Sequence, residues 1–186
     1  MSTKLEDIEV ELLDLYDKNH KLTGKDHIRG EKVPQGYYHL VTNVWIRNKK
    51  GEYLISQRAA DRYSYPLKWE CTGGSVLKGE DSLTAALRET KEEIGLELSK
   101  NDAKFINSVV GRVVNGKRFP DIVDVWLFEY DGKIPLKEAT TKEVVQTLWA
   151  SKKIKEMFKI RELVDALGYF LKEKSFKKNT YCPNYY

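Results

Sequence analysis

Cysteine is scarce in this chain of 186 residues, which contains only Cys71 and Cys182. Two cysteines are too few for a disulfide framework, and their spacing matches no zinc-binding pattern. We therefore interpret them as free thiols of a reducing compartment. Long apolar runs are also missing, since no segment approaches the roughly 20 apolar residues that span a bilayer. Residues 1–20 show no secretory signal pattern, so the sequence predicts a cytoplasmic protein that does not bind membranes.

Charge of one sign is not concentrated anywhere in the chain. The formal net charge is +4, from 32 Lys and Arg against 28 Asp and Glu, and no basic block of five or six residues stands out. Nothing therefore indicates nucleic-acid binding, whereas a mild positive charge is compatible with a small anionic substrate. A hydrophobic fraction of 41% and a charged fraction of 32% are typical of one globular domain with, at most, a small appendage.

The N-terminal segment has the pattern of a β-hairpin. Residues 8–17 alternate apolar and polar side chains, as a half-buried strand does. The segment 17–21 is typical of a turn, and 27–32 could return as the partner strand. We interpret residues 1–35 as a hairpin appendage that ends at a Pro-Gln-Gly break.

The rest of the chain alternates strands with two helices. Residues 37–47 and 52–58 are rich in aromatic and β-branched side chains and predict a second hairpin. A helix is predicted over 82–94, with Asp81 or Ser82 as N-cap and Gly95 after its end. Further strands are predicted at 104–114, 122–130 and 144–149, a last helix at 151–172, and a tail at 173–186. Such a succession is typical of an α/β domain with a mixed sheet.

Three glutamates of the predicted helix crowd one side of it. Glu89 lies three and four residues before Glu92 and Glu93, a spacing that makes neighbours on a helix surface. Like charges at this spacing are destabilising, and the helix dipole disfavours negative charge near a C-terminus. A divalent cation offsets this repulsion, because Mg²⁺ binds carboxylate and phosphate oxygens together. For the three glutamates alone, a solvated acidic face is the alternative.

The flanking residues favour the metal site. Gly73-Gly74 lets the backbone come close to a ligand, and Glu80 follows in the loop. The planar guanidinium of Arg88 can hold a carboxylate in one orientation. Together they predict a metal site whose ligands are oriented by neighbouring side chains.

The spacing of these residues resembles the Nudix box, the signature of the Nudix hydrolase superfamily. Every fixed position of the motif is filled, and Thr90 alone departs, because the family usually has an apolar residue there. We expect a modest packing cost from it. The matching positions are Gly74, Glu80, Arg88-Glu89, Glu92-Glu93 and Gly95-Leu96, separated by five, seven, two and one residues.

The resemblance continues outside the box. Residues 54–58 resemble the family strand that ends in Gln-Arg, residues 68–74 resemble the lead-in to the box, and residues 143–151 resemble a late strand. The resemblance covers about 37–172 and implies a Nudix-type α/β/α sandwich with a mixed sheet, with the Nudix domain at 36–172. The hairpin before it resembles a subgroup that includes isopentenyl-diphosphate isomerase.

The resemblance also implies an activity and a set of site residues. The expected reaction is hydrolysis of the phosphoanhydride bond of a nucleoside diphosphate linked to another moiety, with Mg²⁺, or Mn²⁺ in its place. The general base is either a helix glutamate or Glu143. The resemblance assigns metal binding to Gly74, Glu89, Glu92 and Glu93, catalysis to Arg88, Glu92, Glu93 and Glu143, orientation of the glutamates to Glu80 and Arg88, and substrate binding to Arg58, Tyr63 and Trp69.

Several of these roles have alternatives. Arg58 could equally be a surface arginine, and Tyr63 and Trp69 could pack the loop rather than stack on a base. His39 corresponds to a segment in which the isomerase has a metal-binding histidine, but a strand-end hydrogen bond is the simpler interpretation. Homodimerisation through the hairpin is an expectation from analogy with relatives.

Two other functions compete with hydrolysis. An isomerase of isopentenyl diphosphate needs a cysteine followed closely by a histidine before the box, but those positions hold Gly73 and Ser75, and Cys71 is two residues away. A non-catalytic nucleotide-sensing module usually loses box glutamates, and none is lost here. The markers of ADP-ribose and dinucleoside polyphosphate hydrolases are absent at Gly111 and at 112–114, so the leaving group stays open.

Overall fold

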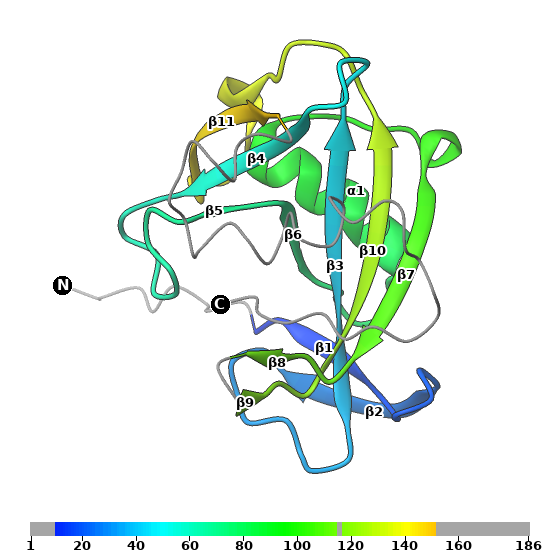
Figure 1. The fold of residues 1–186 in the computed structure, drawn as a ribbon. Coiled ribbons are helices and arrows are strands. Elements are labelled where there is room, and N and C mark those ends of the chain that lie inside the picture. The colour runs from blue at the N-terminus through cyan, green and yellow to red at the C-terminus, as the bar shows by residue number, and fades with distance from the viewer. Residues whose placement is uncertain (1–9, 115–116, 152–186) are drawn as a thin grey trace, which may run out of the picture.

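The computed structural model describes residues 10–114 and 117–151. Over these ranges the chain forms a curled nine-stranded mixed sheet, a small two-stranded sheet and one α-helix that lies behind the central strands (Figure 1). The mixed sheet confirms the predicted α/β class. The elements are β1 Leu12–Tyr16, β2 Leu22–Ile28, β3 Tyr38–Arg47, β4 Tyr53–Arg58, β5 Trp69–Glu70, β6 Thr72–Ser75, α1 Ser82–Ile94, η1 Lys100–Asp102, β7 Lys104–Val110, β8 Val113–Val114, β9 Lys117–Arg118, β10 Asp121–Glu129, η2 Leu136–Glu138 and β11 Val144–Ala150.

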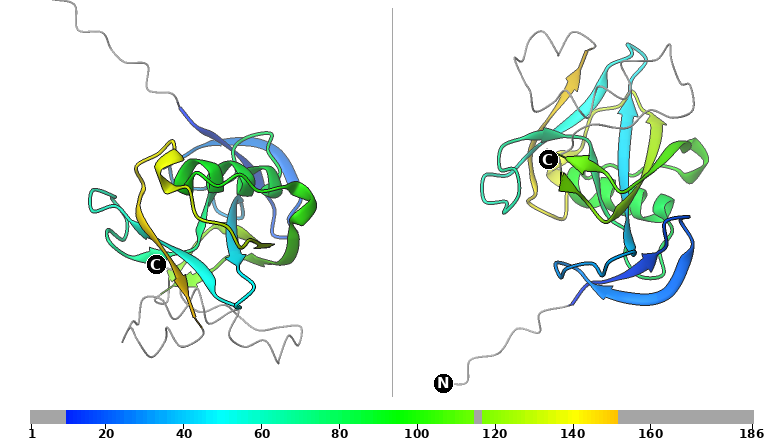
Figure 2. Two further views of the ribbon diagram at one scale, coloured as in Figure 1. Left: turned by 90° about the horizontal axis from the view of Figure 1, so that it is seen from above. Right: turned by 60° about the horizontal axis from the view of Figure 1, so that its bottom comes forward.

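Strands β1 and β2 form the expected N-terminal hairpin. The Asp17 carboxylate accepts hydrogen bonds from the backbone N–H groups of Asn19 and Lys21, at 2.8 and 2.9 Å. This tight turn starts the returning strand at Leu22, earlier than the predicted 27–32. The hairpin adds to the main sheet, because β1 also pairs with the start of β3. It lies at the lower end of the sheet in Figure 1 and in the right-hand view of Figure 2.

The second predicted hairpin opens after a single pair. Arg47 pairs with Tyr53, and β4 then leaves β3 to pair with β5 and β11. Strand β6 occupies the edge of β3 where a continued hairpin would have placed β4, and it pairs antiparallel with residues 41–44. On its other side β3 runs parallel to β10 over nine residue pairs. Strand β6 was not predicted, and its position beside β3 brings the box loop into the sheet.

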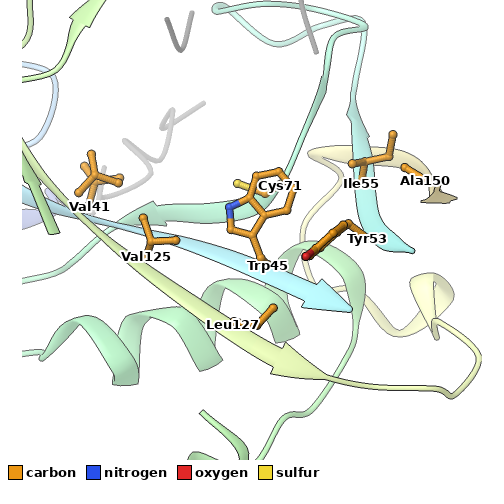
Figure 3. Packing of buried hydrophobic residues seen from close by; sticks show 9 residues of the cluster. Val41, Trp45, Tyr53, Ile55, Cys71, Val125, Leu127 and Ala150 are labelled. Atoms are coloured by element: carbon orange, nitrogen blue, oxygen red, sulfur yellow. The ribbon is translucent and has the colours of Figure 1, made fainter. Parts of the chain in front are cut away.

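Side chains alternate between the two faces of the central strands. One face packs Val44, Ile46 and Phe128 against α1. The other face packs Trp45 against Tyr53 and Cys71, as Figure 3 shows. Cys71 is buried, and burial raises the pKa of its thiol, so this cysteine behaves as a core residue.

Helix α1 begins and ends where the sequence predicts. The Asp81 carboxylate accepts a hydrogen bond from the Thr84 N–H, and Gly95 ends the helix in the left-handed conformation. Thr90 is fully buried, and its hydroxyl donates to the Ala86 carbonyl oxygen at 2.7 Å. Its polar group therefore has a partner, so the departure from an apolar residue leaves no unsatisfied hydroxyl.

The later strands agree with the sequence except at one end. Strand β7 stops at Val110 rather than running to residue 114, because Gly111 turns the chain with a φ of 65°. The predicted helix 151–172 and tail 173–186 lie outside the described residues apart from Ser151. Within the part of the chain that the structure describes, no helix has the length and apolar character needed to cross a membrane.

Candidate active site

The two glycines of β6 bring the box glutamates against the sheet. A Cβ atom on Gly74 would lie 2.3 Å from Oε1 of Glu89, so an alanine there would require this carboxylate to move. The backbone N–H of Gly73 donates to Oε2 of Glu93 at 3.3 Å. The carboxylates of Glu89 and Glu93 thus lie between strand β6 and helix α1.

Arg88 connects the box loop to the helix glutamates. Its Nε and Nη2 donate to the two carboxylate oxygens of Glu80, at 3.0 and 3.1 Å, and Nη2 also donates to the Ser75 carbonyl oxygen at 3.0 Å. Its Nη1 donates to Glu89 at 2.9 Å and to Glu92 at 3.0 Å. The planar guanidinium therefore holds carboxylates from the loop and the helix in one arrangement. The orienting role of Glu80 and Arg88 toward a bound metal stays a prediction.

Glu89 and Glu93 are buried carboxylates. Their exposed fractions are 9% and 6%. Burial raises the pKa of Glu93 well above its usual range, and the negative charges of Glu89, Glu70 and Glu143 raise it further. Burial also raises the pKa of Glu89, although the Arg88 guanidinium opposes this. Because these groups resist ionisation as they stand, a cation placed beside them would be strongly favoured.

The donor set suits a hard divalent cation. The glutamates offer carboxylate oxygens, and the glycine at position 74 lets the Glu89 carboxylate lie close to the backbone. As placed, no three His, Cys, Asp or Glu side chains among residues 10–114 and 117–151 converge closely enough to hold an ion. Arg88 instead holds Glu89 and Glu92. The residues fit such a cation in chemistry and in charge, and rotation of these carboxylates away from Arg88 would free their oxygens.

Arg58 is engaged within the loop that precedes the box. Its Nη1 donates to Oε1 of Glu70 at 2.6 Å, and its Nε donates to the Ser64 carbonyl oxygen at 2.8 Å. Both side chains of the Arg58–Glu70 pair are largely buried. In this arrangement Arg58 fixes the loop and orients Glu70, and its contact with a substrate phosphate stays a prediction.

The predicted aromatic residues divide into one exposed and one packed side chain. Tyr63 is fully exposed, so it does not pack the loop onto the sheet. Trp69 packs against the core cluster that contains Trp45 and Cys71. The structure thus leaves Tyr63 as the aromatic group that is free to stack on a ligand.

Two residues beside the box glutamates were missed by sequence reasoning. Glu70 contributes to the electrostatics of Glu93, and Arg62 forms an ion pair with Glu143 at 2.8 Å. Glu70 stands just before Gly73-Gly74, which is the one signal that could have indicated it. Arg62 and Glu143 are far apart in the sequence, so no local pattern predicts that they meet.

His39 and Arg112 make their contacts with residues 120 and 121. The backbone N–H of His39 donates to the Pro120 carbonyl oxygen, but its ring Nδ1 is buried without a hydrogen-bond partner, and burial lowers its pKa. Arg112 is buried and its Nε donates to Asp121 at 2.8 Å. Arg112 is therefore committed to an ion pair inside the fold.

The fold is thus a mixed sheet whose strand β6, with two glycines, packs on a capped helix and encloses the carboxylates of Glu89 and Glu93. The model of the NUDIX domain family matches residues 37–170, and the chain belongs to the Nudix family.

Individual relatives agree with this assignment. An uncharacterized Nudix hydrolase of Listeria monocytogenes is 50% identical over 95 residues, covering 50% of this chain and 56% of that protein. An isopentenyl-diphosphate Delta-isomerase of Streptomyces coelicolor is 35% identical over 89 residues, covering 47% and 45%. The chain thus spans about half the length of these curated relatives. The crystal structure of DR0079 from Deinococcus radiodurans has the same fold, with a TM-score of 0.58, 21% identity, and coverage of 76% and 83%.

Proposed function

We propose that this protein hydrolyses the phosphoanhydride bond of a nucleoside diphosphate linked to another moiety, with Mg²⁺ or Mn²⁺ as cofactor. The observation that carries the proposal is the arrangement of Arg88, which holds Glu80, Glu89 and Glu92 around the glycine strand. The proposal extends to a cytoplasmic location, on the sequence evidence, and to a homodimer, by analogy.

In this reaction the protein would bind and orient the diphosphate substrate, and a water molecule would attack the phosphoanhydride bond. Glu89, Glu92, Glu93 and the backbone at Gly74 would hold the cation, which supplies Lewis-acid neutralisation of the phosphate charge when bound. Arg88 keeps the helix carboxylates in place through its hydrogen bonds. Either one of the helix glutamates or Glu143, whose negative charge acts on Glu93, would take a proton from the attacking water. Tyr63, whose side chain is fully exposed, would contact the leaving group.

An isomerase of isopentenyl diphosphate is the second candidate, because a relative of that activity covers nearly half of the chain. Isomerisation needs a side chain that can deliver a proton, and a cysteine is the residue expected in this region. Cys71 is buried among Trp45 and Tyr53 in the core. Burial raises the pKa of this thiol and the core covers it, so it is not presented to a substrate, which favours hydrolysis. Formation of an allylic product from isopentenyl diphosphate would reverse this preference.

The test of the proposed function is a substrate panel. We expect Mg²⁺-dependent turnover of at least one compound among nucleotide sugars, coenzymes, and nucleoside di- and triphosphates, measured as phosphate released after phosphatase treatment. Chelation of the metal with EDTA should abolish turnover, and added Mg²⁺ or Mn²⁺ should restore it. Binding of these compounds without cleavage at any metal concentration would instead support a sensing module.

Arg88→Lys is expected to lower kcat by about 10- to 100-fold, because Lys cannot replace the forked contacts of the guanidinium. The expected cause is misplacement of Glu89 and Glu92 rather than loss of charge, since the positive charge is kept. Steady-state kinetics with a metal titration checks this. The apparent Mg²⁺ requirement should rise, and an unchanged kcat with unchanged metal dependence would contradict the orienting role.

A further inference from the structure

The loop of residues 59–68, here called the aromatic loop, lies next to the start of β11. The Ala59 N–H donates to the Glu143 carbonyl oxygen at 2.7 Å, and the side chains of Arg62 and Glu143 form an ion pair at 2.8 Å. A backbone contact and a side-chain contact therefore join the aromatic loop to the residue proposed as base.

We propose that Arg62 is a positioning residue, which holds the Glu143 carboxylate at the catalytic centre and ties its placement to the aromatic loop. The inference rests on the role proposed above for Glu143. It assigns a function to a side chain that does not itself need to touch the substrate.

The surrounding charges explain why Glu143 needs a partner. Burial raises the pKa values of Glu93 and Glu70, and the negative charge of Glu143 adds to both shifts. Like charges repel, so an unpaired Glu143 carboxylate, which is about one-third exposed, would turn towards water. The guanidinium of Arg62 opposes this repulsion from the loop side.

Arg62 is available for this task, whereas Arg58 is not. Arg58 is held by Glu70 and by the Ser64 carbonyl oxygen. The Nε of Arg62 is buried and has no hydrogen-bond partner in the structure, so the ion pair with Glu143 is the contact that places its guanidinium. Its side chain is one-third exposed, so the pair is partly shielded from solvent.

The aromatic loop needs such restraints. Tyr65 and Leu67 have φ angles of 53° and 62°, in the left-handed region that side chains with a Cβ rarely adopt. Contacts elsewhere must enforce this conformation. Since the same loop carries the exposed Tyr63, the Arg62–Glu143 pair connects the position of a candidate ligand-stacking group with that of the candidate base.

A double-mutant cycle tests the inference on the full chain. The variants are Arg62→Ala, Arg62→Lys, Glu143→Gln and the Arg62→Ala/Glu143→Gln pair, assayed with the substrate found in the panel. Arg62→Ala should lower kcat by about tenfold with little change in KM, and the double variant should be no slower than Glu143→Gln. Arg62→Lys should recover most of the rate. Independent, multiplicative losses would overturn the proposal.

Hydrogen–deuterium exchange gives a readout that does not depend on turnover. Peptides covering 59–68 and 143–150 should both exchange faster than in wild type in Arg62→Ala and in Glu143→Gln. In the double variant they should exchange no faster than in either single variant. Acceleration confined to one segment would refute the coupling. Lys49→Ala, which removes the lysine of the Lys49–Asp131 ion pair, is the matched control and should change neither exchange nor kcat.

The two experiments separate this inference from the proposed function. If Glu143→Gln keeps wild-type turnover, Glu143 is not the base, and the catalytic part of the inference falls with it. If Glu143→Gln is slow but Arg62→Ala is not, the proposed function stands and the positioning role is refuted.

Discussion

Glu93→Gln is expected to lower kcat/KM by about three orders of magnitude. The substitution removes a negative charge that the cation needs, and metal electrostatics contribute several kcal/mol to such reactions, at about 1.4 kcal/mol per tenfold in rate. Glu93 lies deepest of the box glutamates, in contact with the Gly73 backbone. The measurement is steady-state turnover of the panel substrate across a Mg²⁺ titration, with Glu92→Gln as the second variant.

The stability of the metal-free protein separates lost chemistry from lost fold. Burial raises the pKa of Glu93 in the folded state, so its stabilising contribution is complete below the unfolded-state pKa and is lost as pH rises through the folded-state pKa. Glutamine does not ionise, so Glu93→Gln avoids this loss of stability as pH rises. The variant should therefore be more stable than wild type at neutral pH without metal. Added Mg²⁺ should raise the melting temperature of wild type more than that of the variant. Wild-type turnover in both glutamine variants would refute the site.

Gly73→Ala is expected to destabilise the fold by about 4 kcal/mol or more, at the high end for single substitutions. A Cβ atom there would lie 2.1 Å from the Thr42 carbonyl oxygen and 3.1 Å from the Asn43 Cα atom. Both are backbone atoms of β3 and cannot rotate away, so β6 would have to separate from β3. Urea unfolding monitored by tryptophan fluorescence measures the effect, since Trp45 lies in the adjacent core.

Gly79→Ala provides the comparison for Gly73→Ala. Gly79 also has a positive φ, of 81°, but a Cβ atom there meets nothing within 4 Å. Only the conformational cost applies, at about 1–2 kcal/mol. Equal destabilisation by the two alanines would show that the close approach of β6 to β3 is not what makes Gly73 necessary.

Local spacing was sufficient to predict the helix and its carboxylates. The boundaries of α1, its Asp81 and Gly95 caps, and the grouping of Glu89, Glu92 and Glu93 all depend on residues within about four positions of one another. The contact of Arg88 with Glu92, four residues later, follows from the same short-range geometry, whereas its contact with Glu80 depends on how the loop before the helix folds back. These features could be predicted because a helix has a fixed period.

Pairing between distant segments could not be predicted in the same way. The second hairpin opened after Arg47–Tyr53 because β6 competes for the edge of β3. Strand β7 ended early because Gly111 adopts a positive φ. Each outcome depends on which of several possible strand edges is occupied, and this is decided by the packing of the whole sheet.

The sequence by itself determined the family, the helix α1 and the glutamates that could hold a cation, because these follow from short spacings along one chain segment. Only the tertiary structure decided that Arg58 holds Glu70, that Cys71 is a core residue, and that Arg62 meets Glu143. Those contacts join the aromatic loop, the core and the start of β11. Their charges act on one another through space, so they arise only when the sheet brings the segments together.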